Sequence, residues 1–213
     1  MPAARPRPPD TQRLWVCVGG RSRVSVSMTQ VRQVLFIQGG GAGAHDDWDS
    51  ILVDGLRREL GDGYDIRYPR MPVEDDPTYA RWSAVIRREM SDLNAGAIIV
   101  GHSVGGAITI HAIEEQPPEV ELFAIVLISA PFVGEGGWAG DEFQLPGDLG
   151  DRLPQGVRVL VFHGLDDDTV PPSHSDLYER AIPQAHLYKL PGRDHQLNGD
   201  LGEVASAIRS CAP

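Results

Sequence analysis

The chain has 213 residues, of which 41% are hydrophobic and 23% charged, and this composition is typical of one globular domain with a substantial core. Its formal net charge of -11 argues against sequence-independent nucleic-acid binding and against docking on anionic lipid, since both require basic surfaces. No apolar run approaches the roughly 20 residues of a membrane-spanning helix. We therefore predict neither nucleic acid nor membrane as a partner.

Residues 1–29 differ in composition from the rest of the chain. They are rich in proline and arginine and contain a single acid, Asp10. We predict a disordered tail, or a start codon assigned too early, because Met28 stands just before the first convincing strand; a transit peptide is the alternative. The folded domain is expected over residues 30–213.

Two cysteines, Cys17 and Cys211, occur near the two ends of the chain. Neither lies in a C-x-x-C or His-rich pattern, so we predict no disulfide framework and no metal site. Unpaired thiols suit a reducing compartment, and we therefore expect a cytoplasmic protein.

Strand-like and helix-like segments alternate from about residue 32 onward. Short aliphatic and aromatic runs predict strands at 34–37, 64–68, 97–100, 123–128, 157–162 and 185–190. Apolar residues at helical spacing predict helices at 47–60, 76–93, 107–113, 171–182 and 201–208. Strands that alternate with helices indicate an α/β fold, with a parallel sheet covered on both faces.

Two of these helices carry signals for their first residue. Asp47 is predicted to cap the first helix, and Asp76 followed by Pro77 predicts the start of the second. The apolar face of the first helix is expected to comprise Trp48, Ile51, Leu52, Leu56 and Leu60. The segment 132–155 interrupts the alternation, and a loop of this length is usually functional or disordered.

The turn after the third predicted strand is the most informative segment. Ile98-Ile99-Val100 leads into Gly101-His102-Ser103-Val104-Gly105-Gly106, which contains the G-x-S-x-G pattern of a serine held on a sharp strand-to-helix turn. Gly105 and Gly106 would let the following helix approach the strand closely. The alternative is an ordinary strand–turn–helix junction with a capping serine. The strand before the pattern and the helix after it favour Ser103 as a nucleophile.

A serine hydroxyl needs a base that takes its proton and a third group that orients the base. On this fold the acid should follow a later strand and the histidine should follow the last one. His195 is the histidine in the loop directly after the last predicted strand. The fifth strand leads into three adjacent acids, Asp166, Asp167 and Asp168, and an acidic turn in front of a helix explains at least two of them.

An acyl-transfer site also needs backbone N–H donors for the oxyanion. We expect one at Val104 and the other in Gln38-Gly39-Gly40-Gly41, where Gly40 is the first choice and Gly41 the second. Nucleotide binding at this turn is disfavoured because the lysine of a phosphate-binding loop is missing.

Four residues are candidates for the wall of a substrate pocket. They are Gly41, His45, Trp48 and His102. For Trp48 a place on the apolar helix face is an equal alternative, and His102 is expected to pack or hydrogen-bond beside the nucleophile.

Together these motifs resemble those of the α/β-hydrolase-fold serine hydrolases over roughly residues 32–210. The resemblance rests on 38–41, 101–106, 125–131, 163–171 and 194–195. The short segment 132–155, and Tyr68-Pro69-Arg70-Met71-Pro72 followed by Trp82, are similar to the compact hydrolases of the retinoblastoma-binding-protein-nine type.

The resemblance implies a mainly parallel sheet of about six strands, a minimal lid, no metal or cofactor, and a small acyl substrate as partner. The expected reaction is hydrolysis of an ester, a thioester or an amide by Ser103, His195 and an aspartate. The family pattern H-G-x-x-D-x-x-V-P places that aspartate at Asp167, with Asp166 as the alternative. Gln38 departs from the family, since many members have histidine there.

Two other functions fit the same resemblance. One is a non-catalytic interaction protein on a hydrolase scaffold, and the other is a different chemistry of the fold, such as that of a C–C hydrolase or a perhydrolase.

Overall fold

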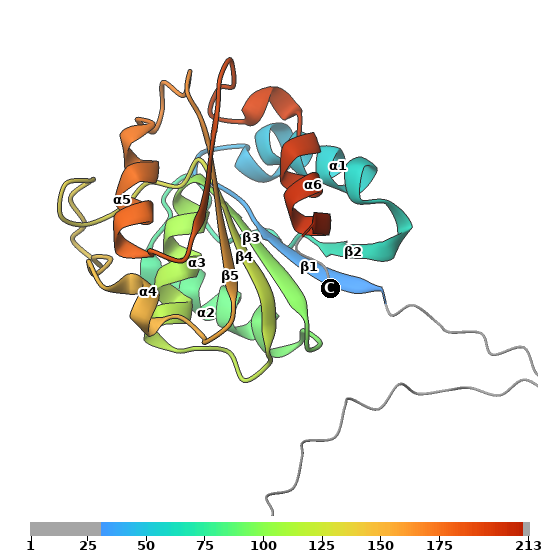
Figure 1. Cartoon of the computed structure of the whole chain (residues 1–213), viewed down its shortest axis with the longest axis horizontal. Coiled ribbons are helices and arrows are strands. Elements are labelled where there is room, and N and C mark those ends of the chain that lie inside the picture. The colour runs from blue at the N-terminus through green and yellow to red at the C-terminus, as the bar shows by residue number, and fades with distance from the viewer. Residues whose placement is uncertain (1–30, 211–213) are drawn as a thin grey trace, which may run out of the picture. The chain divides into compact units, whose positions relative to one another are not determined.

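We analysed a computed structural model of the chain, which describes residues 31–210 (Figure 1). The predictions for the amino-terminal segment and for Cys17 and Cys211 lie outside the described residues.

The core of residues 31–210 is a six-stranded sheet in the order β2-β1-β3-β4-β5-β6, with all neighbouring strands parallel. The strands are β1 (Arg32–Ile37), β2 (Tyr64–Arg67), β3 (Ala97–His102), β4 (Leu122–Ile128), β5 (Arg158–Gly164) and β6 (His186–Leu190). The six predicted strands and the parallel sheet are confirmed. The strand order reverses between β1 and β3, and in open α/β sheets ligands bind beyond the carboxyl ends of the strands at such a point.

Helices cover both faces of the sheet (Figure 1). One face carries α1 (Asp49–Leu60) and α6 (Gly202–Ser210), and the other carries α2 (Tyr79–Ser91), α3 (Ser103–Glu115), α4 (Leu149–Arg152) and α5 (Ser173–Ala181). Three short helical turns complete the set, namely η1 (Ala44–Trp48), η2 (Gly61–Gly63) and η3 (Leu197–Gly199). Within residues 31–210, no helix combines the length and the apolar character that a membrane crossing requires.

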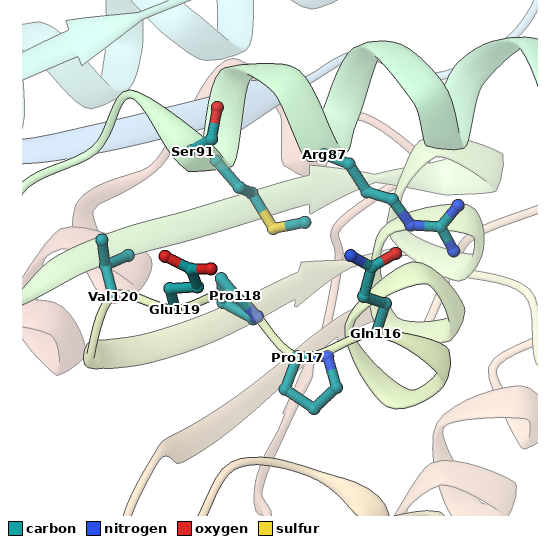
Figure 2. Close-up of a pocket in the computed structure, with 8 residues that line it drawn as sticks. Arg87, Ser91, Gln116, Pro117, Pro118, Glu119 and Val120 are labelled. Atoms are coloured by element: carbon teal, nitrogen blue, oxygen red, sulfur yellow. The ribbon is translucent and has the colours of Figure 1, made fainter.

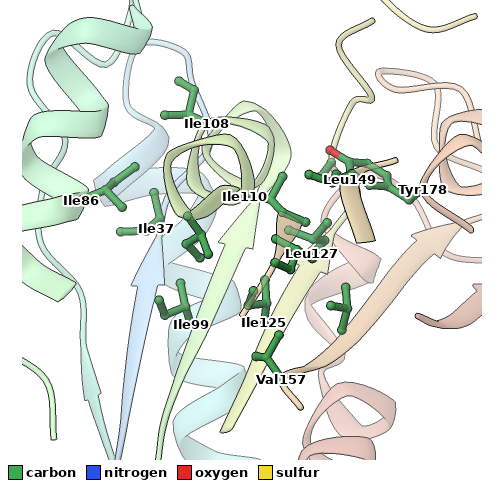
Figure 3. Packing of buried hydrophobic residues seen from close by; sticks show 14 of the residues in the cluster. Ile37, Ile86, Ile99, Ile108, Ile110, Ile125, Leu127, Leu149, Val157 and Tyr178 are labelled. Atoms are coloured by element: carbon green, nitrogen blue, oxygen red, sulfur yellow. The ribbon is translucent and has the colours of Figure 1, made fainter. Parts of the chain in front are cut away.

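Two apolar layers follow from the alternation of side chains along each strand. Leu35 and Ile37 of β1 point into the layer formed with α2, α3 and α5, part of which is drawn in Figure 3. Val34 and Phe36 of the same strand point into the layer formed with α1 and α6. The central strands are therefore buried on both faces, which explains their unbroken apolar sequences.

The start of the first helix differs from the prediction. Asp47 caps nothing, because it lies inside the π-helical turn η1, and α1 begins at Asp49. The wider winding of a π-turn rotates the following residues, so Trp48 and Ile51 are each 57% exposed. The buried face of α1 is Leu52, Val53, Leu56 and Leu60.

The start of the second helix also lies later than predicted. α2 begins at Tyr79 with Thr78 as its N-cap residue, and Pro77 remains in the preceding loop. The segment 132–155 contains the single-turn helix α4, and buried Phe132, Leu145 and Leu149 fix it to the core.

The first turn of α3 touches the ends of β1 and β3 through backbone atoms. A Cβ atom added at Gly105 would lie 1.9 Å from the carbonyl oxygen of Gln38, and one at Gly106 would lie 2.8 Å from that of Gly101. Only glycine fits such spacings. The two glycines therefore set how closely the helix approaches the sheet.

We predict that Gly105→Ala lowers the free energy of unfolding by about 3 kcal/mol or more, because a methyl group there meets backbone that cannot move aside. Gly63→Ala is the matched control, since nothing lies within 4 Å of its added Cβ; it should change stability by less than about 1 kcal/mol. Urea unfolding of both variants measures the difference. Equal stability of the two variants would contradict the close contact.

Candidate active site

Ser103 lies at the junction of β3 and α3 in a strained backbone conformation. Its φ is 51°, in the left-handed region that residues other than glycine rarely adopt. The preceding His102 is still extended, so the chain turns within one residue. The turn leaves Ser103 half-buried at the carboxyl edge of the sheet.

His195, in the loop after β6, connects Ser103 to an aspartate. Its Nε2 lies 3.0 Å from Ser103 Oγ, and its Nδ1 lies 2.8 Å from Asp167 Oδ2. A carboxylate only accepts hydrogen bonds, so Nδ1 carries the proton and Nε2 is free to accept from the serine hydroxyl. This is the arrangement that lets a histidine remove a serine proton.

Asp167 is the acid that faces His195, whereas Asp166 and Asp168 are exposed. The backbone N–H groups of Thr169 and Val170 donate to its Oδ1 at 2.9 and 2.8 Å. Burial opposes ionisation of Asp167, but hydrogen bonds from His163, His195 and the Val170 N–H outweigh it and hold its pKa well below the ordinary value.

His163, at the end of β5, is the second histidine beside this carboxylate. Its Nε2 lies 3.2 Å from Asp167 Oδ2 and 2.9 Å from the Val170 carbonyl oxygen. The His163 ring therefore contacts both the Asp167 carboxylate and the backbone of the loop that carries it.

The glycine-rich loop after β1 packs against the strand-to-helix turn 101–105, which we call the elbow. A Cβ added at Gly39 would be 3.0 Å from Ser103 Cβ, and one at Gly40 would be 3.0 Å from Val104 Cγ1. Within residues 31–210 the Gly40 N–H has no hydrogen-bond partner, whereas the Gly41 N–H donates to the Glu74 carbonyl. The Val104 N–H belongs to the first turn of a helix, where N–H groups lack intrahelical acceptors. Gly40 and Val104 thus offer two donors beside Ser103.

Gln38 fastens this loop to the segment after β2. Its fully buried amide accepts from the Met71 N–H at 3.0 Å and donates to Glu74 Oε2 at 2.7 Å. Glu74 also accepts from the N–H groups of Gly43 and His45. Burial opposes ionisation of Glu74, but these hydrogen bonds lower its pKa.

The candidate pocket residues occupy different environments. His45 stacks on Tyr68 with ring centroids 4.2 Å apart, and Trp48 faces outward from η1. His102 is 2% exposed and does not line a pocket, because its ring is hydrogen-bonded beneath the elbow to Asp49 and to the His195 carbonyl. Asp49 was not predicted as a site residue.

The loops at the carboxyl edge of the sheet concentrate negative charge. The loops after β1, β2, β5 and β6 contain the acids Asp46, Asp47, Glu74, Asp75, Asp76, Asp166, Asp167, Asp168, Asp194 and Asp200. The Lys or Arg residues of these four loops are Arg70 and Arg193, and Arg81 in the first turn of α2 pairs with Asp76. All three arginines are paired with acids. The whole chain has 30 acids and 19 Lys or Arg residues, so the ratio of acids to bases is higher in these loops than in the chain as a whole. The electrostatic potential at Ser103 is expected to be negative.

The pocket in Figure 2 is lined by none of these residues. It is lined by Arg87, Met90 and Ser91 of α2 and by residues 116–120, which lead from α3 into β4. It therefore lies at the amino end of a strand, at the opposite edge of the sheet from Ser103. Among residues 31–210, no group of three or more His, Cys, Asp or Glu side chains is placed to hold a metal ion.

This chain is similar to known proteins in both sequence and fold. The sequence model of the alpha/beta hydrolase family matches residues 34–201. The ydeN gene product of B. subtilis superposes with a TM-score of 0.65 at 22% identity, covering 84% of this chain and 98% of that one. A serine hydrolase involved in carbazole degradation gives 0.64 at 20%, covering 85% and 91%. Mouse alpha/beta hydrolase domain-containing protein 10 gives 0.60 at 17%, covering 84% and 88%.

The sequences of curated proteins contain no match to this chain. The structural likenesses, all at low identity, show the α/β-hydrolase fold.

We predict that Asp167→Asn destabilises the protein at neutral pH by roughly 2 kcal/mol, because a buried carboxylate loses charge-assisted hydrogen bonds. Because the pKa of Asp167 is lowered in the folded state, its ionisation stabilises the fold fully at pH values above the unfolded pKa of about 4. This stabilisation is lost as the pH falls towards the folded pKa. The difference in unfolding free energy between Asp167→Asn and wild type should therefore be largest above about pH 5 and become smaller below it. Urea unfolding between pH 3 and 7 tests this.

Asp166→Asn is the matched control for that series, since this neighbouring carboxylate is exposed. It should follow the wild type at every pH. A gap for Asp167→Asn that does not change with pH would count against the lowered pKa.

Proposed function

Because this chain belongs to the alpha/beta hydrolase family, we propose that it is a serine hydrolase that cleaves an ester or thioester through an acyl-enzyme. The observation that carries the proposal is the chain of hydrogen bonds from Ser103 through His195 to Asp167. The donors at Gly40 and Val104 support it, because they lie where an oxyanion would form beside Ser103.

The proposed reaction has two halves. Ser103 Oγ attacks the carbonyl carbon while its proton moves to His195 Nε2, and Asp167 stabilises the resulting imidazolium. The oxyanion accepts hydrogen bonds from the Gly40 and Val104 N–H groups. His195 then gives the proton to the departing alcohol or thiol. A water molecule, deprotonated by His195, attacks the acyl-enzyme and releases the acid and the free serine.

The acidic loops around Ser103, which we call the acidic rim, affect which substrates reach the site. Repulsion lowers the local concentration of anions at the mouth of the site and raises that of cations. We therefore favour neutral or cationic acyl substrates over anionic ones, such as thioesters that carry the phosphates of coenzyme A. Amide hydrolysis remains within the same mechanism.

Three further possibilities use the same scaffold. The compact domain and the short segment 132–155 favour kinship with the retinoblastoma-binding-protein-nine type of hydrolase. A C–C hydrolase or a perhydrolase would use the same Ser103 and His195. A non-catalytic interaction protein is disfavoured, because nothing in the hydrogen-bond chain from serine to aspartate is missing.

We predict that a fluorophosphonate probe labels the protein and that Ser103→Ala abolishes both the labelling and the hydrolysis of p-nitrophenyl butyrate. Loss of the nucleophile should reduce kcat by about 10⁴-fold or more. Ser91→Ala, at the far edge of the sheet, should label and hydrolyse as wild type does. A wild-type protein that neither reacts with the probe nor hydrolyses the ester would contradict the serine hydrolase proposal.

We also predict that p-nitrophenyl butyrate has a kcat/KM about tenfold higher than the anionic mono-p-nitrophenyl succinate of equal chain length, because the rim repels the carboxylate. Added salt should reduce this ratio by screening. A variant in which the exposed acids Asp75, Asp166 and Asp168 are replaced by their amides should reduce it as well. Equal rates for the two esters at low salt would contradict the role of the rim.

A further inference from the structure

A second histidine–carboxylate pair lies beneath the elbow, and the proposed reaction does not use it. His102 Nδ1 is 2.9 Å from Asp49 Oδ2, and His102 Nε2 is 3.1 Å from the carbonyl oxygen of His195. Asp49 is 1% exposed and His102 is 2% exposed. Both groups are therefore removed from water, where an uncompensated charge is costly.

The partners of His102 indicate its protonation state. Each ring nitrogen faces an oxygen, and a backbone carbonyl can only accept. Asp49 Oδ2 also accepts from the Gly39 N–H at 2.6 Å. A neutral imidazole has a single N–H and could serve only one of these two acceptors, whereas an imidazolium serves both.

The charges around the ring agree with this assignment. Burial opposes protonation of His102, but the adjacent Asp49 carboxylate and the His195 carbonyl outweigh it and raise its pKa. Asp167 adds a second, more distant negative charge. The other titratable group beside it is the ring of His195, whose centroid is 4.9 Å away.

We propose that Asp49 and His102 form a buried ion pair that positions the oxyanion loop and the base against the elbow. The pair connects three loops at one point. Asp49 holds the N–H of Gly39, the residue before the candidate oxyanion donor Gly40. His102 belongs to the elbow itself and holds the backbone of His195.

Asp49 and His102 are therefore positioning residues, which touch no reacting atom. A small displacement of catalytic groups is enough to slow a reaction strongly. The catalytic part of this inference rests on the proposed hydrolase function, whereas the ion pair itself can be tested without turnover.

The direct test is NMR of the full chain labelled with ¹⁵N-histidine. Both ring nitrogens of His102 should show the chemical shifts of protonated nitrogens at pH 7.5, above the value of about 6.5 at which an unperturbed histidine loses its proton. His102→Gln identifies the signals. A neutral His102 at pH 7.5 would overturn the ion pair, whatever the enzyme hydrolyses.

The kinetic test is Asp49→Asn, which keeps an acceptor for the Gly39 N–H but removes the counter-charge of His102. We expect kcat for p-nitrophenyl butyrate to fall on the order of 10- to 100-fold, with KM changed by less than about twofold, and the ¹⁵N signals of His102 to move to the neutral pattern. Asp54→Asn, an exposed acid on the same helix, should change neither.

The outcomes separate the two claims. If Asp49→Asn keeps the wild-type kcat while His102 becomes neutral, the pair does not position the site. If Ser103→Ala leaves hydrolysis intact, the hydrolase proposal fails, and the NMR result on the pair still stands. Circular dichroism and a thermal midpoint for Asp49→Asn distinguish slower catalysis from a loss of fold.

Discussion

The site depends on the backbone contact between the first turn of α3 and the ends of β1 and β3. Gly105 leaves no space for even a methyl group against the Gln38 carbonyl. This contact holds Ser103 in its left-handed conformation and keeps the β1 loop directly above the elbow. Strain at one residue is maintained because the surrounding packing leaves no alternative path for the chain. The remaining groups then come from separate strands, Asp167 after β5 and His195 after β6, since parallel strands end at the same edge.

Beneath this edge, polar groups are buried in two connected networks. Asp167 is surrounded by donors from His163, His195 and its own loop. Gln38 and Glu74 join the β1 loop to the segment after β2. In a low-dielectric interior such hydrogen bonds hold their loops rigidly; within residues 31–210, His163 Nδ1 is buried without a hydrogen-bond partner. The loops of the site are thus ordered by hydrogen bonds where no regular secondary structure holds them.

The sequence predicts the sheet and the order of Ser103 and His195 because buried parallel strands leave unbroken apolar runs and the fold restricts which loops can meet. It does not predict Asp49 or Glu74 as scaffolding residues. Each stands among neighbouring acids, Asp46 and Asp47 in one case and Asp75 and Asp76 in the other, and only tertiary packing decides which carboxylate is buried. The exposure of Ile51 is not predicted for a similar reason, since a π-helical turn changes the period on which helical faces are judged.

The position of β6 has a consequence for the order in which the site is assembled. Within residues 31–210, β6 is both an edge strand and the last strand, and it pairs there with β5 alone. During synthesis the elbow and the acid loop therefore emerge from the ribosome before the segment that carries the base. A nascent chain that ends between Asp167 and β6 contains the serine and the aspartate but not His195. On the proposed mechanism, Ser103 therefore gains its base only once β6 has been synthesised and has paired with β5.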